Sequence, residues 1–211
     1  MTIAKKQIHL DADFVLMAYC KGYFPMADVC SGAISWYSPD PRAILPLDAF
    51  RISRSLRKRI NSRIYEVQVN REFETVIRSC ADREQTWISE EIVRVYITLH
   101  ERGFAHSVES WHGSKLVGGL YGVAIGGAFF GESMFSEQRD ASKVALVHLV
   151  DRLRQRKFKL LDTQFMNDHI AQFGATEVPR STYLTLLAEA LCCDCSFSTH
   201  EIDVCGAMAR V

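Results

Sequence analysis

The sequence predicts an α+β fold in which a mixed, largely antiparallel sheet packs against helices. Apolar residues alternate with polar or small ones through 105–111, 116–123 and 128–135, which indicates three consecutive strands. A helical stripe of leucine and valine follows over 140–153, and 158–164 reads as a further strand. With one helix before these strands and others after them, this order is typical of a sheet covered by helices.

The elements before residue 105 are short and have clear boundary signals. Pro25, Pro39 and Pro41 exclude helix and favour an ordered loop between short strands. A basic helix is expected over 54–60 and a strand over 64–69. The expected start residues of the helices are Asp11, Ser53, Asn70, Ser89, Asp140 or Ser142, Asn167 and Pro179.

A length of 211 residues suits one main domain with a smaller appendage. We expect a small N-terminal α/β domain over 1–62 and a larger domain over 63–211, with the boundary between residues 60 and 85. The apolar run at 14–20 is too short to cross a membrane and does not resemble an export signal. The sequence therefore predicts a cytoplasmic protein.

Seven cysteines, an odd number, suggest reduced thiols rather than a disulfide framework. Five possible metal ligands lie near the end of the chain. They are Cys192, Cys193, Cys195, His200 and Cys205. Because their spacing lacks two Cys-x2-Cys pairs, small buried or tail thiols are favoured over a zinc site, and no metal is expected.

The formal net charge is zero, so global charge indicates no partner, but two segments are locally basic. The first contains Arg51, Arg54, Arg57, Lys58 and Arg59. The second contains Arg152, Arg154, Arg156 and Lys157. Each could follow a phosphate backbone, and each could equally be an ordinary solvated helix face.

The candidate chemistry lies after a cluster of glycines between 118 and 131, which suggests bulges or a ligand close to the backbone. Glu132 should share a face of its strand with Phe130 and Met134, while Asp162 and Gln164 share a face of theirs. If the two strands are neighbours, these carboxylates and the amide converge. From pattern alone, a hydrogen-bonded polar patch at a sheet end is the simpler interpretation. No P-loop or nucleophile triad is present in the sequence.

Ten motifs, in order along residues 14–190, resemble those of the bacterial leucyl/phenylalanyl-tRNA–protein transferase family. They include Tyr19-Cys-Lys-Gly-Tyr-Phe-Pro25, Trp36-Tyr-Ser-Pro-Asp-Pro-Arg42, Thr86-Trp-Ile88, Gly131-Glu-Ser-Met-Phe-Ser136 and Leu161-Asp-Thr-Gln164. The resemblance implies a C-terminal acetyltransferase-like (GNAT-type) domain. It also implies transfer of Leu or Phe from aminoacyl-tRNA to an N-terminal Arg or Lys of proteins, which creates a bacterial degradation signal.

The resemblance also implies roles for particular residues. Asp162 should orient Gln164, whose amide oxygen contacts the attacking amine, and Glu132 should help to hold the amino groups. Trp87 should stack on the 3′-terminal adenine. From pattern alone, a core tryptophan is the commoner case. The residues expected to line the Leu/Phe slot are Leu120, Phe129, Leu146, Leu149, Leu153 and Leu161.

This sequence departs from the family where a second tryptophan often follows the Phe-Pro pair, because Met26 stands there. Met26 or Trp36 is then expected to complete the adenine contact. The implied partners are aminoacyl-tRNA, through both basic segments, and the acceptor proteins. No cofactor and a monomeric state are expected, and methionine is a further possible donor.

Two other classes of protein compete with this interpretation. One is an N-acetyltransferase that uses acetyl-CoA, but residues 136–142 lack the glycines of a pyrophosphate loop. The other is a non-catalytic module that binds tRNA or peptide. Asp162, Gln164 and Glu132 argue against that module without excluding it.

Overall fold

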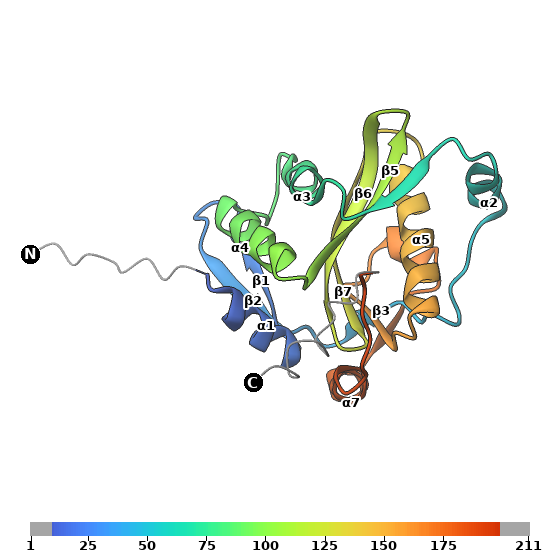
Figure 1. Cartoon of the computed structure of the whole chain (residues 1–211). Coiled ribbons are helices and arrows are strands. Elements are labelled where there is room, and N and C mark those ends of the chain that lie inside the picture. Colours follow the sequence, from blue (N-terminus) through green and yellow to red (C-terminus); the bar gives the residue numbers. More distant parts are fainter. Residues whose placement is uncertain (1–9, 199–211) are drawn as a thin grey trace, which may run out of the picture.

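The computed structural model describes residues 10–198, which form a mixed α+β fold with a mostly antiparallel sheet, as predicted (Figure 1). The helices are α1 (Ala12–Cys20), α2 (Arg54–Asn61), α3 (Phe73–Ala81), α4 (Glu90–Glu101), α5 (Ala141–Gln155), α6 (Asp168–Ala171) and α7 (Arg180–Leu191). The strands are β1 (Phe24–Ala27), β2 (Ile34–Tyr37), β3 (Arg42–Ile44), β4 (Glu66–Val69), β5 (Ala105–His112), β6 (Lys115–Ile125), β7 (Ala128–Ser136), β8 (Leu160–Gln164) and β9 (Thr176–Val178).

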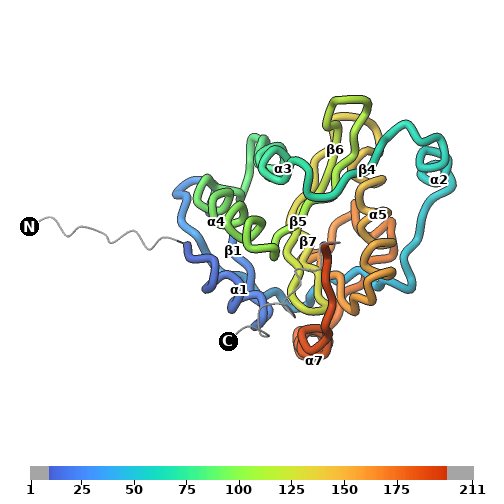
Figure 2. Tube along the Cα trace, viewed as in Figure 1, coloured from blue at the N-terminus to red at the C-terminus, as the bar shows by residue number. Residues whose placement is uncertain are grey.

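Seven strands form one sheet in the order β4-β5-β6-β7-β8-β3-β9, and β1 and β2 form a separate hairpin. Helix α5 packs on one face of the large sheet, and α3 and α4 cover the other (Figure 1). Each face has its own hydrophobic cluster. Figure 2 follows the chain from α1 and β1 along the base of the sheet to α2 on the far side. Within residues 10–198, no helix is both long and apolar enough to cross a bilayer.

Most of the predicted helix starts are confirmed. Asp11 accepts hydrogen bonds from the backbone of Asp13 and Phe14, at 2.9 and 3.1 Å. The side chains of Ser53, Ser89 and Asn167 also cap their helices. These caps satisfy amides of the first turn that have no partner within the helix.

Asn70 does not cap α3, so that prediction is wrong. Its side-chain oxygen instead accepts from the backbone of Ser107, at 3.0 Å. The buried carboxylate of Glu109, on the neighbouring strand β5, accepts from the amides of Arg71 and Glu72 at 2.9 and 2.8 Å. The segment that leads into this helix is therefore held by a residue distant in sequence, which local cap rules do not consider.

Strands β3 and β9 were not predicted. Each has three residues, too few for alternation to be visible. Strand β3 lies between β8 and β9 and is antiparallel to both. A segment from the first fifty residues thus belongs to the large sheet, and a domain division near residue 62 stays a prediction.

Strands β7 and β8 are parallel neighbours, but they pair over a short distance. The register runs from Ala128↔Leu160 to Phe130↔Asp162. Beyond Phe130, β7 continues beside β6 to Ser136, whereas β8 pairs with β3 and ends at Gln164. This divergence opens the sheet at the point where the polar residues lie.

A β-bulge changes the direction of the side chains in β7. Gly122 is opposite Gly131 and Tyr121 is opposite Ser133, so Glu132 is the extra residue. Phe130 accordingly packs in the cluster below α3 and α4, and Met134 packs against the α5 cluster. The prediction that Phe130, Glu132 and Met134 share a face is wrong, because one inserted residue reverses the alternation.

Candidate active site

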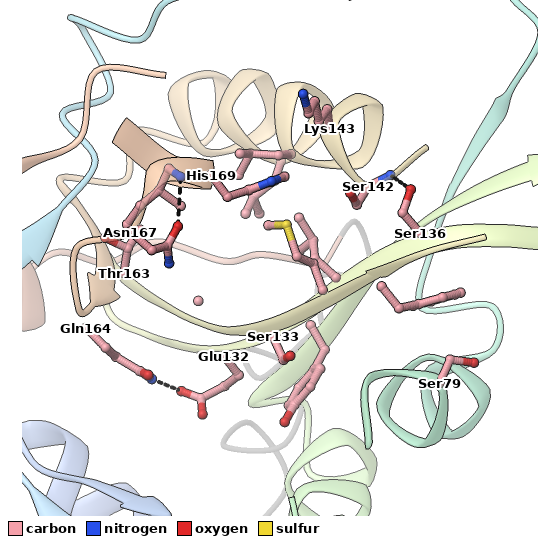
Figure 3. Close-up of a pocket in the computed structure, with 18 of the residues that line it drawn as sticks. Ser79, Glu132, Ser133, Ser136, Ser142, Lys143, Thr163, Gln164, Asn167 and His169 are labelled. Atoms are coloured by element: carbon pink, nitrogen blue, oxygen red, sulfur yellow. Dashed lines mark hydrogen bonds between the residues drawn. The ribbon is translucent and has the colours of Figure 1, made fainter. Parts of the chain in front are cut away.

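A cavity of about 870 Å³ opens where β7 and β8 diverge (Figure 3). Its walls come from both strands, from the first half of α5 and from the segment between α3 and α4. The sequence-predicted residues that line it are Trp87, Leu120, Glu132, Leu146, Leu149, Leu161 and Gln164. Phe129 and Leu153 lie in the same hydrophobic cluster as these leucines and are fully buried.

Asp162 is fully buried behind the cavity and accepts four hydrogen bonds from three residues. Arg42 of β3 binds it with Nε at 2.9 Å from Oδ1 and Nη2 at 2.6 Å from Oδ2. Tyr183 of α7 donates to Oδ2 at 2.8 Å, and the backbone amide of Gln164 donates to Oδ1 at 2.8 Å. Two buried carboxylate oxygens thus receive four donors, which compensates the loss of hydration.

The network explains how Gln164 is held. Its φ of 65° lies in the left-handed region, which costs a non-glycine residue about 1–2 kcal/mol. The bond from its backbone amide to Asp162 stabilises this turn at the end of β8. The side-chain amide nitrogen donates to Glu132 Oε1 at 2.7 Å (Figure 3). The amide oxygen then remains as the acceptor for a ligand.

Glu132 lies on the bulge, half-buried at the wall of the cavity. Its carboxylate also accepts from Tyr19 of α1 at 2.7 Å and from Tyr96 of α4 at 3.2 Å. Burial raises the pKa of Glu132 to about 7, although the two tyrosine hydrogen bonds act in the opposite direction. Near neutral pH the carboxyl group is therefore divided between its ionised and protonated forms.

Arg42, Tyr19, Tyr96 and Tyr183 were not assigned to the site from the sequence. Arg42 and Tyr19 do stand within the motifs that carry the family resemblance. Tyr96 lies on the apolar stripe of α4 and looked like an ordinary core residue. Its role appears only when α1, α4 and β7 are brought together.

The hairpin of β1 and β2, which carries Met26 and Trp36, adjoins the segment that carries Trp87. The Ala27 amide donates to the Trp87 carbonyl at 3.0 Å, which joins β1 to the start of α4. Met26, next to Ala27, is partly buried, as is Trp36 on the paired strand β2. The ring of Trp36 packs edge-on against Phe14, with centroids 5.1 Å apart. Trp87 lines the cavity, whereas Met26 and Trp36 are not among the residues that line it.

The two basic segments differ in how their side chains are used. Nε atoms of Arg152 and Arg154 donate to the carbonyls of Phe197 and Leu47, each at 2.9 Å, and Arg156 donates to Ser198 at 2.8 Å. These guanidinium groups hold neighbouring chain segments. On α2, the side chains of Arg54, Arg57, Lys58 and the preceding Arg51 are exposed.

Among residues 10–198, no cluster of three or more His, Cys, Asp or Glu residues is arranged to hold a metal ion. His200 and Cys205, part of the cysteine-rich cluster, lie outside the described residues.

The leucine-lined cavity ends at the Gln164 amide and the Glu132 carboxylate. It can hold the apolar side chain of an acyl group while these two polar groups bind an incoming amine. This arrangement is typical of an acyltransferase. Two family models match the chain. "Leucyl/phenylalanyl-tRNA protein transferase N-terminal domain" matches residues 9–40, and "Leucyl/phenylalanyl-tRNA protein transferase" matches residues 44–188. The chain belongs to the leucyl/phenylalanyl-tRNA protein transferase family.

Curated relatives with this name are similar over nearly their whole length. The protein of Maricaulis maris is 52% identical over 203 residues, 94% of each chain. That of Gloeobacter violaceus is 53% identical and covers 90% of this chain and 98% of its own. Among solved structures, L-PGS from Bacillus licheniformis has a TM-score of 0.41 at 15% identity, over 76% of this chain and 55% of that chain. The family assignment does not depend on this last likeness.

Proposed function

We propose that this protein moves leucine or phenylalanine from aminoacyl-tRNA to the N-terminus of acceptor proteins that begin with Arg or Lys. The product carries a degradation signal of the bacterial N-degron pathway. The observation that carries the proposal is the Gln164 amide, held by Asp162 and Glu132 at the end of a leucine-lined slot. Membership in the family supplies the substrate classes.

The transfer reaction requires little from the enzyme beyond positioning of its two substrates. Attack of an amine on an aminoacyl ester is downhill, so the reaction needs no nucleotide hydrolysis. An α-amino group with a pKa of about 8 is partly neutral at cytoplasmic pH. Positioning the two substrates can lower the barrier by about 7–11 kcal/mol. In this scheme Asp162 fixes Gln164, and the Gln164 amide oxygen accepts a hydrogen bond from the attacking amine.

The slot favours side chains that are apolar and unbranched at Cβ. Leu120, Leu146, Leu149 and Leu161 form its wall, with Phe129 and Leu153 behind them. Such a wall separates ligands that differ by one methylene by about 10–200-fold. Methionine, which has a flexible chain of similar volume, is therefore a further donor side chain.

The tRNA end is placed on the hairpin side of the cavity, where the Trp87 ring stacks on the terminal adenine. Met26 and Trp36 supply apolar contact beside it, since no tryptophan follows Pro25. The order β5–β6–β7, then α5, then β8 parallel to β7 supports a GNAT-type domain, preceded by a small N-terminal domain. The proposal includes a monomer that acts in the cytoplasm.

A transfer assay tests the proposed function. Radiolabelled Leu-tRNA would be mixed with the protein and a peptide that begins with Arg, beside an identical peptide that begins with Ala. We expect label on the Arg peptide alone, and loss of transfer in Gln164→Ala. The matched control is Gln155→Ala, at the exposed far end of α5, which should retain transfer. If tRNA binds but Leu-, Phe- and Met-tRNA all give no product, the protein is a binding module.

Binding of tRNA should weaken steeply with salt. Phosphate contacts release counterions, so the logarithm of the association constant falls by about 0.7–0.9 per contact for each unit of log salt concentration. Replacing Arg57 or Lys58 on α2 by alanine should reduce this slope by about one contact each. Arg154→Ala should change it less, because Arg154 already binds the Leu47 carbonyl. A flat salt response in a filter-binding titration would exclude both basic segments as phosphate surfaces.

A further inference from the structure

We propose that Glu132 takes the proton that the acceptor amine loses, and that Tyr19 and Tyr96 are positioning residues that tune this carboxylate for the task. The inference rests on the proposed function and adds a proton acceptor to it. Gln164 cannot serve in this way, because a neutral amide does not retain a proton.

The charged and titratable groups around Glu132 come from five elements. Tyr19 and Tyr96 donate to it from α1 and α4. Burial and then the nearby Glu132 charge raise the pKa of Tyr121 on β6, which makes no hydrogen bond to Glu132, and the charges of Asp162 and Arg42 also act on Glu132. Arg42 is committed to Asp162 by two hydrogen bonds. Within residues 10–198, no cation forms an ion pair with Glu132, so its negative charge is available to a ligand.

Glu132 lies within reach of an amine bound to Gln164. The amide nitrogen of Gln164 is 2.7 Å from Glu132 Oε1. The amide oxygen belongs to the same planar group, so an amine that donates to this oxygen approaches the carboxylate from the cavity, where both residues are exposed to a ligand. One N–H of the amine then points to Gln164, and a second can point to Glu132.

The proton balance of the step is complete. The amine nitrogen forms a bond to the ester carbonyl carbon, and one N–H proton passes to the Glu132 carboxylate. The bond between that carbon and the ribose oxygen then breaks. Protonated Glu132 returns the proton to the departing oxygen, which leaves as the hydroxyl of the tRNA end. The enzyme ends in its starting state, and no other reactant is consumed.

The tyrosines explain why this carboxyl group suits the task. Burial alone would favour the protonated form, which cannot accept a proton, and the hydroxyls of Tyr19 and Tyr96 oppose this by donating to the ionised form. The result is a pKa of about 7, close to the working pH, which is the most effective range for a general base. The two hydroxyls also contact each other, which fixes both rings.

Tyr121 provides a matched comparison within the same cluster. Its ring packs against Tyr96 with centroids 5.7 Å apart, and it is fully buried like Tyr19. Its hydroxyl has no hydrogen-bond partner among the described residues. Loss of this hydroxyl therefore leaves the bonds to Glu132 intact, whereas loss of the Tyr19 hydroxyl removes one.

The pH dependence of transfer tests the proposal. In the wild type, log kcat/KM should rise with a slope of two below pH 7, because both the amine and Glu132 must lose a proton, and with a slope of one between about pH 7 and 8. In Glu132→Gln the slope should be one throughout, and kcat at saturating peptide should fall by about 10²–10⁴-fold.

Tyrosine variants make the test specific. Tyr19→Phe removes a donor to the ionised carboxylate, so the lower midpoint should move to higher pH by about one unit. Tyr121→Phe should leave this midpoint where it is. A Glu132→Gln variant whose KM rises while kcat and its pH slope stay unchanged would overturn the proposal and leave Glu132 as an ammonium anchor. A wild-type protein that transfers nothing would instead refute the proposed function.

Discussion

Replacing Asp162 by alanine should abolish transfer and lower the free energy of unfolding by about 3–5 kcal/mol. The carboxylate is the partner of Arg42, whose side chain is 1% exposed. Without it the guanidinium remains buried and uncompensated, while the Tyr183 hydroxyl and the Gln164 amide each lose their acceptor. The strained backbone of Gln164 is then free to relax out of its position against Glu132.

Stability and catalysis can be separated with a double variant. Arg42→Met combined with Asp162→Leu removes both charges, and its unfolding midpoint in urea should recover much of the loss seen in Asp162→Ala. Transfer should stay absent, because Gln164 still lacks the acceptor that fixes its backbone. Recovery of transfer together with stability would show that Asp162 acts through folding alone.

Gly122→Ala should have the second large effect, because it disrupts the bulge that aims Glu132 at the cavity. A Cβ at this position would overlap the Phe130 carbonyl oxygen and lie 2.5 Å from Phe129 Cε1. Backbone and a fully buried ring cannot both move aside, so we expect destabilisation of about 3 kcal/mol, at the upper end for overpacking. Transfer by the folded fraction should fall as well, since β6 and β7 must separate beside Glu132.

Gly113→Ala, in the turn between β5 and β6, is the matched control. This glycine has a φ of 61°, and a Cβ there meets no atom of residues 10–198 within 4 Å. The substitution should cost only the left-handed backbone penalty, about 1–2 kcal/mol, and should leave transfer intact. Thermal unfolding and the transfer assay applied to both variants check the prediction. Equal losses of transfer in both variants would show that the bulge does not determine transfer.

The main helices and strands could be predicted from the sequence because the patterns that indicate them are local. Alternation over β5, β6 and β7 and the caps at Asp11, Ser53 and Ser89 need no knowledge of distant residues. The sequence left open whether the strands that carry Glu132 and Gln164 are neighbours. The structure shows that β7 and β8 are parallel neighbours, which brings these two side chains together. The motif resemblance, not periodicity, supplied the roles proposed for these residues.

What could not be predicted depends on contacts between distant segments. The glycines between 118 and 131 suggest a bulge but not its position, so strict alternation failed at Glu132, where the bulge inserts one residue. The Glu109 carboxylate, on another strand, binds the two amides just before α3, and Asn70 does not cap the helix. The sequence does not indicate that Tyr19 and Tyr96 bind the Glu132 carboxylate or that Arg42 binds Asp162. These contacts form only when three separate parts of the chain fold together around the two carboxylates.

The position of β3 in the large sheet also determines when, during synthesis, the site around Asp162 can form. Arg42 and Asp162 are 120 residues apart, and Tyr183 follows Asp162 by another 21. During synthesis, β3 has neither of its neighbouring strands until β8 and β9 have left the ribosome. Pairings across such long loops form slowly. The hydrogen-bonded setting of Asp162 is thus completed only after α7 has been made, and a chain truncated before α7 would carry the substrate slot without the full network behind it.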